Sequence, residues 1–216
     1  TGGNVSFYNQ GPDGPVYPTP TIGMVGSLED INNKMTLDFK AVGDHLYLVG
    51  RSRNCINSSE YLHKICGVEY SPAPDFDLDE EFQLQHAIAG LIQAKTINAA
   101  HDVSEGGVFI TLCEAGFNRS LGFNVTSAVG VRKDAWLFGE AQSRVVVSVS
   151  PEHVNAFEQS LSSQGMLFES LGKVTAGSIQ IDGEDWGHIL EWKTLYDTAI
   201  EKYLSAESAE SALSAM

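Results

Sequence analysis

Seven consecutive residues, from His101 to Gly107, bring together a carboxylate, a hydroxyl and two adjacent glycines between two apolar segments. Glycine lets a backbone approach a ligand closely, and the first turn of a helix presents unpaired N–H groups that bind anions. A carboxylate is the kind of hard oxygen ligand that magnesium takes. The segment therefore predicts a site for a phosphate-bearing ligand and its magnesium ion, formed by Asp102, Ser104, Gly106 and Gly107. The alternative is an ordinary turn in which Ser104 caps the helix and the glycines only relieve crowding.

Motifs for several other kinds of site are missing from the sequence. It contains no G-x-x-x-x-G-K-[ST] phosphate loop, no G-x-G-x-x-G after a predicted strand and no G-x-S-x-G nucleophile elbow. The three cysteines, Cys55, Cys66 and Cys113, show neither metal-ligand spacing nor the even number of a disulfide framework. We therefore expect reduced thiols, with Cys66 buried rather than nucleophilic.

The composition limits the classes of partner. The 216 residues include 13 Lys and Arg against 28 Asp and Glu, which gives a net charge of −15 at pH 7. Such an acidic chain lacks the clustered cations of a nucleic-acid or anionic-membrane surface, but it can bind phosphorylated ligands through magnesium and helix N-termini. No signal peptide and no apolar run of membrane-spanning length is visible, so we expect a cytoplasmic protein.

Apolar patterns place strands and helices between residues 21 and 204. Short apolar runs predict strands at 21–26, 45–50, 97–103, 121–125, 144–149, 168–174 and 178–181. Helical spacing of apolar residues predicts helices at 79–96 and 190–204, and a helix-start signal predicts another at 151–164. Further helices are expected at 58–65 and 108–117. This mixture indicates one α/β domain of the α+β type, with helices covering a single mixed β-sheet. Residues 1–20, rich in Gly, Pro and Asn, are expected to be an arm from a preceding domain, and residues 205–216 a disordered tail.

Three local signals refine these elements. Asp77 with Glu80 resembles a capping box at the start of the second helix. Ser150 followed by Pro151 resembles an N-cap and first helical residue. The last two strands are expected to pair with each other around a turn at Gly177.

Four segments carry a further pattern. They are Gly3-Asn4-Val5-Ser6-Phe7-Tyr8-Asn9, the run from Pro18 to Gly26, the turn from His101 to Gly107, and the run from Leu137 to Arg144. In this order they resemble the phosphoribosylformylglycinamidine synthases, also called formylglycinamide ribonucleotide amidotransferases, of purine biosynthesis. The first segment is the most specific. Turns like the third occur across the superfamily that includes aminoimidazole ribonucleotide synthetase and selenophosphate synthetase.

In that family the synthetase region is a duplicated pair of halves, each with an ATP-binding N-terminal domain and an α/β C-terminal domain. The resemblance implies that residues 1–20 end the second N-terminal domain and that residues 21–204 form the second C-terminal domain. It implies a C–N ligase that converts formylglycinamide ribonucleotide, ATP and glutamine-derived ammonia to formylglycinamidine ribonucleotide, ADP and phosphate. The family's ATP-side catalytic histidine and lysine lie outside this sequence, so we expect the chain alone to be inactive.

The resemblance also implies roles for three residues of the arm. By the family pattern Gly3 contacts ATP, Asn4 ligates magnesium and Ser6 contacts the phosphoribosyl substrate. Each residue type suits its role, since a bare backbone allows close approach, an amide oxygen suits a hard cation and a hydroxyl suits a polar substrate. The alternative is that the three residues merely form a turn at a domain junction.

Further roles fall on two turns of the domain. Asp102 matches a magnesium-binding aspartate of the first-half copy, and Glu140 and Gln142 match a substrate-binding Glu-Ser-Gln there. Ala141 stands in place of the serine and removes a hydroxyl. In the family the second C-terminal domain can instead line an auxiliary, non-catalytic nucleotide site, in which Asp102, Ser104, Glu140 and Gln142 would hold a structural ATP or ADP, or nothing.

The implied partners are the remaining synthetase domains of the same polypeptide and a glutaminase subunit or domain, since no Gly-x-Cys-x-Gly elbow surrounds a cysteine here. One alternative is a non-catalytic domain that braces the duplicated core. Another is membership of a different superfamily branch, such as aminoimidazole ribonucleotide synthetase, against which the Asn4-Val5-Ser6 segment argues.

Overall fold

The computed structural model describes residues 8–12, 14–16 and 22–214, and the chain divides into two compact units, residues 1–32 and 33–216. In the first unit, β1 (Asn9–Gly11) and β2 (Gly14–Val16) pair antiparallel. A short 3-10 turn, η1, follows at Ile31–Asn33. The strand predicted at 21–26 was wrong, because residues 22–26 form no strand and Met24 and Val25 are almost fully exposed. An apolar run becomes a strand only where a second strand accepts its backbone hydrogen bonds.

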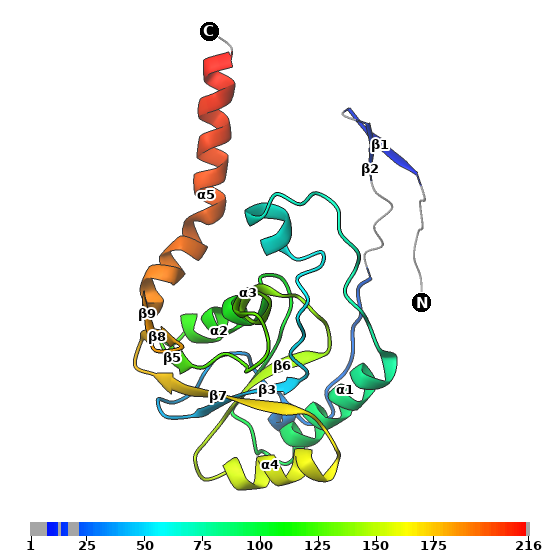
Figure 1. The fold of residues 1–216 in the computed structure, drawn as a ribbon, viewed down its shortest axis with the longest axis vertical. Coiled ribbons are helices and arrows are strands. Elements are labelled where there is room, and N and C mark those ends of the chain that lie inside the picture. Colours follow the sequence, from blue (N-terminus) through cyan, green and yellow to red (C-terminus); the bar gives the residue numbers. More distant parts are fainter. Residues whose placement is uncertain (1–7, 13, 17–21, 215–216) are drawn as a thin grey trace. The chain divides into compact units, whose positions relative to one another are not determined.

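The second unit is built on one seven-stranded sheet (Figure 1). In spatial order its strands are β4 (Ala99–Asp102), β6 (Arg144–Val149), β3 (His45–Gly50), β7 (Phe168–Thr175), β5 (Gly122–Val125), β8 (Ser178–Ile181) and β9 (Glu184–His188). All neighbours pair antiparallel except β5 and β8, which are parallel. The prediction of a single mixed sheet covered by helices is therefore confirmed.

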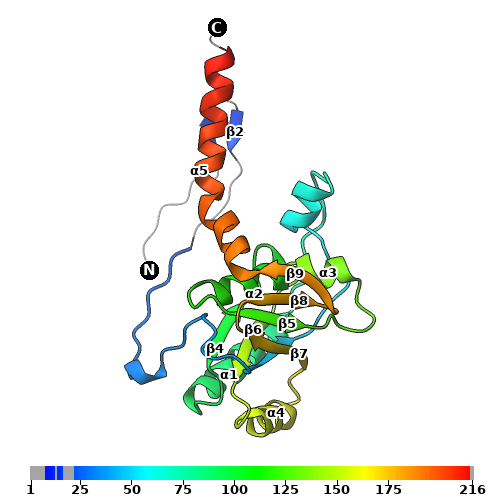
Figure 2. The same cartoon turned by 90° about the vertical axis from the view of Figure 1, so that its left-hand side faces the viewer.

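Helices cover both faces of this sheet (Figures 1 and 2). On one face lie α2 (Gly107–Phe117), α3 (Lys133–Phe138) and the first turns of α5 (Ile189–Ser214); on the other lie α1 (Leu78–Gln93) and α4 (Val154–Ser163). Successive residues of β3 point to opposite faces of the sheet and pack in two hydrophobic cores. Leu46 and Leu48 pack in the core under α2 and α3, and Tyr47 and Val49 pack in the core under α1 and α4. Burial on both sides explains why β3 and β6 are nearly continuous apolar runs.

The ends of several helices differ from the sequence prediction. Asp77 caps α1 as predicted, accepting from the amides of Asp79 and Glu80 at 2.9 and 3.0 Å. The Glu80 carboxylate instead pairs with arginines. Ser150 does not cap α4, which begins only at Val154. The predicted helix at 58–65 is a single π-helical turn, η2 (Tyr61–Ile65), and α5 continues to Ser214 instead of ending at 204.

The pairing of the last strands also differs. β7 and β8 do not pair with each other, because β5 lies between them and bonds to both. β9 and α3 were not predicted at all.

None of the described helices is long and apolar enough to cross a lipid bilayer.

The cysteines separate by exposure, and the expectation that Cys66 is buried was wrong. Cys113 lies buried in α2, Cys55 is partly buried and Cys66 is exposed at the end of η2. Burial raises the pKa of the Cys113 thiol far above its usual value, and only the thiolate reacts with alkylating reagents.

We therefore expect iodoacetamide to modify Cys66 first and Cys113 more slowly by about 100-fold or more, because Cys113 must wait for local opening. Peptide mass spectrometry over a time course measures the three rates. In denaturant all three should react alike. Equal rates for Cys66 and Cys113 in the native protein would contradict the burial.

Candidate functional site

The predicted site residues that belong to the second unit lie at one end of the main sheet. β3 and β4 both end beside the start of β6, since Gly50 pairs with Arg144 and Asp102 with Val145. Three loops consequently gather at this end: residues 51–60 after β3, residues 103–106 after β4, and residues 139–143 before β6. The antiparallel pairing of β6 with both other strands thus brings the Asp102 turn and the Glu140 loop together.

Asp102 lies on a pocket and not in the core. Its side chain is 77% exposed, and it shares with Glu81 and Gln142 the wall of a pocket of about 430 Å³. The full lining is Phe76, Glu81, Leu84, Gln85, Asp102, Val103, Gln142, Ser143, Arg144 and Val145. Two carboxylate side chains and one amide side chain therefore line the same cavity, and carboxylate and amide oxygens are ligands that a hard cation takes.

His101 ties the Asp102 turn to α2. Its Nε2 lies 2.9 Å from a carboxylate oxygen of Glu114, and its Nδ1 lies 3.5 Å from a carboxylate oxygen of Asp102. The His101 side chain is only 12% exposed. The imidazole thus lies between two carboxylates, with a hydrogen-bond distance to the one on α2 and a longer distance to the one at the end of β4.

Glu140 occupies the start of α2. One oxygen of its carboxylate accepts from the backbone N–H of Gly106 and from that of Glu60, each at 2.9 Å. The positive end of a helix dipole favours such a negative charge. Ser104 does not cap the helix through its side chain, because the N-cap residue is Gly106 and has no side-chain cap. The alternative of a serine cap was therefore wrong.

The two glycines of the turn adopt the left-handed region, with φ of +82° at Gly106 and +71° at Gly107. A Cβ on Gly107 would lie 2.6 Å from the carbonyl oxygen of Leu137 and 2.8 Å from the Cα of Phe138. A Cβ on Gly106 would collide with the side chain of Ile110. The close approach that Gly107 permits is thus to the backbone at the end of α3.

Arg144 is a site residue that sequence reasoning missed. It is 3% exposed, and it donates from Nε to the carbonyl of Ala141 at 2.8 Å and from a terminal nitrogen to that of Gly139 at 2.7 Å. Burial lowers the pKa of Arg144 to about 10, against the opposing effect of the Glu169 carboxylate. It therefore remains charged at neutral pH. A lone arginine before three valines was the signal available in the sequence.

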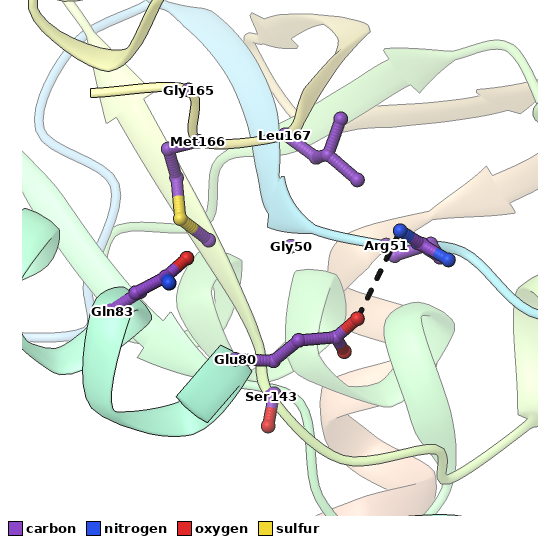
Figure 3. A pocket seen from close by; sticks show the side chains of 8 residues that line it. All are labelled: Gly50, Arg51, Glu80, Gln83, Ser143, Gly165, Met166 and Leu167. Carbon is purple, nitrogen blue, oxygen red and sulfur yellow. Dashed lines mark ion pairs between the residues drawn. The ribbon is translucent and has the colours of Figure 1, made fainter. Parts of the chain in front are cut away.

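A second pocket of about 270 Å³ shares Ser143 with the first (Figure 3). Arg51 and Glu80 both line it and lie 3.9 Å apart at their nearest charged atoms, and Arg53 pairs with the other oxygen of Glu80. The Ser143 hydroxyl donates to Glu81 at 2.8 Å. Met166 closes the opposite wall of this pocket.

The three predicted site residues of the arm, Gly3, Asn4 and Ser6, lie outside the described residues. Within the described ranges, no three His, Cys, Asp or Glu side chains cluster closely enough to form a metal centre. A cation at Asp102 would therefore need oxygen ligands from other sources, such as a bound phosphate.

Comparison with known proteins gives one family match and many curated relatives. Residues 41–182 match the family described as AIR synthase related protein, C-terminal domain. The chain is 38% identical over 179 residues to the phosphoribosylformylglycinamidine synthase subunit PurL of Alkaliphilus metalliredigens, covering 83% of this chain and 24% of that one. It is 42% identical over 188 residues to the PurL subunit of Salinibacter ruber, covering 84% and 25%. The chain thus spans about a quarter of the length of these relatives.

Solved structures share the fold. "T. maritima PurL complexed with FGAR" superposes with a TM-score of 0.59 at 14% identity, covering 74% of this chain and 29% of that one. "T. maritima PurL complexed with ATP" gives 0.57 at 14% identity, covering 72% and 26%.

Proposed function

The chain belongs to the AIR synthase related C-terminal domain family, and from this premise we propose that it is part of a phosphoribosylformylglycinamidine synthase. The observation that carries the proposal is its 38–42% identity, over more than four-fifths of its length, to relatives that bear this name. In the proposed reaction, ATP phosphorylates the amide oxygen of formylglycinamide ribonucleotide. Ammonia then displaces the phosphate. Phosphorylation converts a poor leaving oxygen into a good one.

The proposal assigns this chain to a larger assembly. The remaining synthetase domains would supply the ATP-side catalytic residues, and a glutaminase would supply ammonia. A solved structure of similar fold, "Structure of PurLQS from Thermotoga maritima", joins PurL to further components in its name, which supports such an assembly. A cytoplasmic location is part of the same proposal.

The Asp102 pocket is the proposed nucleotide and magnesium site of this chain. PurL from T. maritima has been solved in complex with ATP and with ADP, which supports a nucleotide ligand. The exposed Asp102 carboxylate and the Gln142 amide would hold magnesium and substrate, with Ser104 and Gly107 nearby in the same turn. Magnesium would offset phosphate charge in a chain of net charge −15. For the arm we keep the roles that the family pattern implies, in which Gly3 would contact ATP, Asn4 magnesium and Ser6 the phosphoribosyl substrate.

Titration of the chain with ADP and magnesium tests this assignment. We expect Asp102→Ala to weaken binding by about tenfold or more, because the variant loses the proposed metal ligand. Glu152→Ala is the matched control, since it removes an exposed carboxylate after β6, at the opposite end of the sheet. Identical weak heats for all three proteins would instead favour the alternative function, a non-catalytic domain that braces the duplicated synthetase core.

A further inference from the structure

The backbone around Glu140 is fixed from both sides. Arg144 binds the carbonyl groups of Gly139 and Ala141, the two residues that flank Glu140. Gly139 has no room for a side chain, because a Cβ would collide with the carbonyl oxygens of Ala135 and Cys55. The backbone on both sides of Glu140 is therefore held in place.

Its carboxylate holds a projecting segment, residues 58–77, which we call the flap (Figure 2, cyan to green). The Glu60 amide binds Glu140, and the next residue, Tyr61, stacks on Phe138 with ring centroids 5.1 Å apart. Two successive residues of the flap, Glu60 and Tyr61, thus attach it to Glu140 and to Phe138, two residues earlier in the chain. Beyond these attachments its outer residues, Lys64 and Ile65 among them, are exposed.

The flap in turn reaches the Asp102 pocket. Its first residue is joined to its later part, since the Ser58 amide donates to the Ser71 hydroxyl at 2.7 Å and the Ser58 hydroxyl donates to the carbonyl of Pro72 at 3.0 Å. A few residues further along, Phe76 forms part of the pocket wall. Hydrogen bonds and short stretches of chain therefore link the Glu140 carboxylate to the pocket that Asp102 also lines.

We propose that Glu140 is a positioning residue and not a substrate ligand. Its carboxylate accepts from the backbone amide at the start of α2 and from the flap. It thereby fixes the position of the flap, and the flap carries Phe76, which forms part of the pocket wall. The two amide hydrogen bonds that hold it, at Gly106 and Glu60, come from segments far apart in the sequence. Loss of the carboxylate frees both amides at once. The inference rests on the proposed function only in treating the Asp102 pocket as a ligand site.

Amide hydrogen exchange of the chain, measured by NMR, tests the proposal without any ligand. In Glu140→Ala we expect exchange at Gly106, Glu60 and Ser58 to rise together by about tenfold or more, while Leu48 in the central strand stays protected. Glu140→Gln keeps an acceptor oxygen without the charge and should show a smaller rise at the same three amides. Gln142→Ala, an exposed neighbour in the same loop, should leave all four amides unchanged.

A rise at only one of the three amides, or at none, would overturn the proposal. So would an equal rise at Leu48, which would mean that the whole unit opens, or an equal effect of Gln142→Ala. The result is independent of the titration with ADP and magnesium. The titration can show no binding while exchange at the three amides still rises together in Glu140→Ala. That combination would reject the proposed ligand but would still support the positioning role of Glu140.

Discussion

Replacing Gly107 by alanine is expected to lower the free energy of unfolding by about 3 kcal/mol. The backbone at this position has φ of +71°, which strains any residue with a Cβ. The new methyl group would also lie 2.6 Å from the Leu137 carbonyl oxygen and 2.8 Å from Phe138 backbone atoms. Backbone cannot rotate away as a flexible side chain does, so the end of α3 must shift from α2. Urea unfolding followed by circular dichroism measures the loss.

Gly130→Ala is the matched control. Gly130 also has a positive φ, +84°, but a Cβ there meets nothing within 4 Å. This variant should therefore show the conformational cost alone, about 1 kcal/mol. Equal losses for the two variants would show that contact with α3 contributes nothing at Gly107.

Arg144→Met is expected to cost about 4 kcal/mol of unfolding free energy. The variant removes a buried guanidinium and leaves the carbonyls of Gly139 and Ala141 without their donor. An unpaired buried acceptor costs about 1–3 kcal/mol. Arg144→Lys keeps the charge but lacks the planar fork that serves both carbonyls, so an intermediate loss is expected. Urea midpoints and slopes of the three proteins measure the series.

Arg51→Met serves as the control for Arg144. The Arg51 side chain is 54% exposed and lies 3.9 Å from Glu80, so its loss should change stability by no more than about 0.5 kcal/mol. If Arg144→Met were equally mild, the two carbonyls would have found other donors or water, and the fixed backbone around Glu140 would be in doubt.

Much of the sheet was predictable because its strands carry their own signal. β3 and β6 are apolar runs long enough to identify, the apolar spacing of α1 placed that helix, and the apolar segment after the two glycines was expected to be the buried helix α2. α3 is only six residues long, too short to show a period, and the sequence of β9, Glu-Asp-Trp-Gly-His, does not alternate cleanly. Insertion of β5 between β7 and β8 depends on contacts between distant segments, which local patterns do not contain.

The candidate site likewise has features that the sequence predicted and features that it did not. The two glycines indicated the turn before α2, and Asp102 lies at the exposed position that a ligand role requires. The partners of Glu140 were not predictable, because Gly106 and Glu60 lie 34 and 80 residues away in the chain. Arg144 was missed because an arginine at the start of a strand is ordinarily expected at the surface.

The central place of β3 has a consequence for biosynthesis. β3 hydrogen-bonds to β6 and β7, and the nearer of these begins at Arg144. Roughly 100 further residues must leave the ribosome before its first partner exists, which takes about 5–20 s at ordinary rates of translation. During that interval one of the most apolar segments of the protein is without its sheet. Nascent chains halted shortly before residue 144 should therefore bind chaperones more strongly than chains released after residue 175.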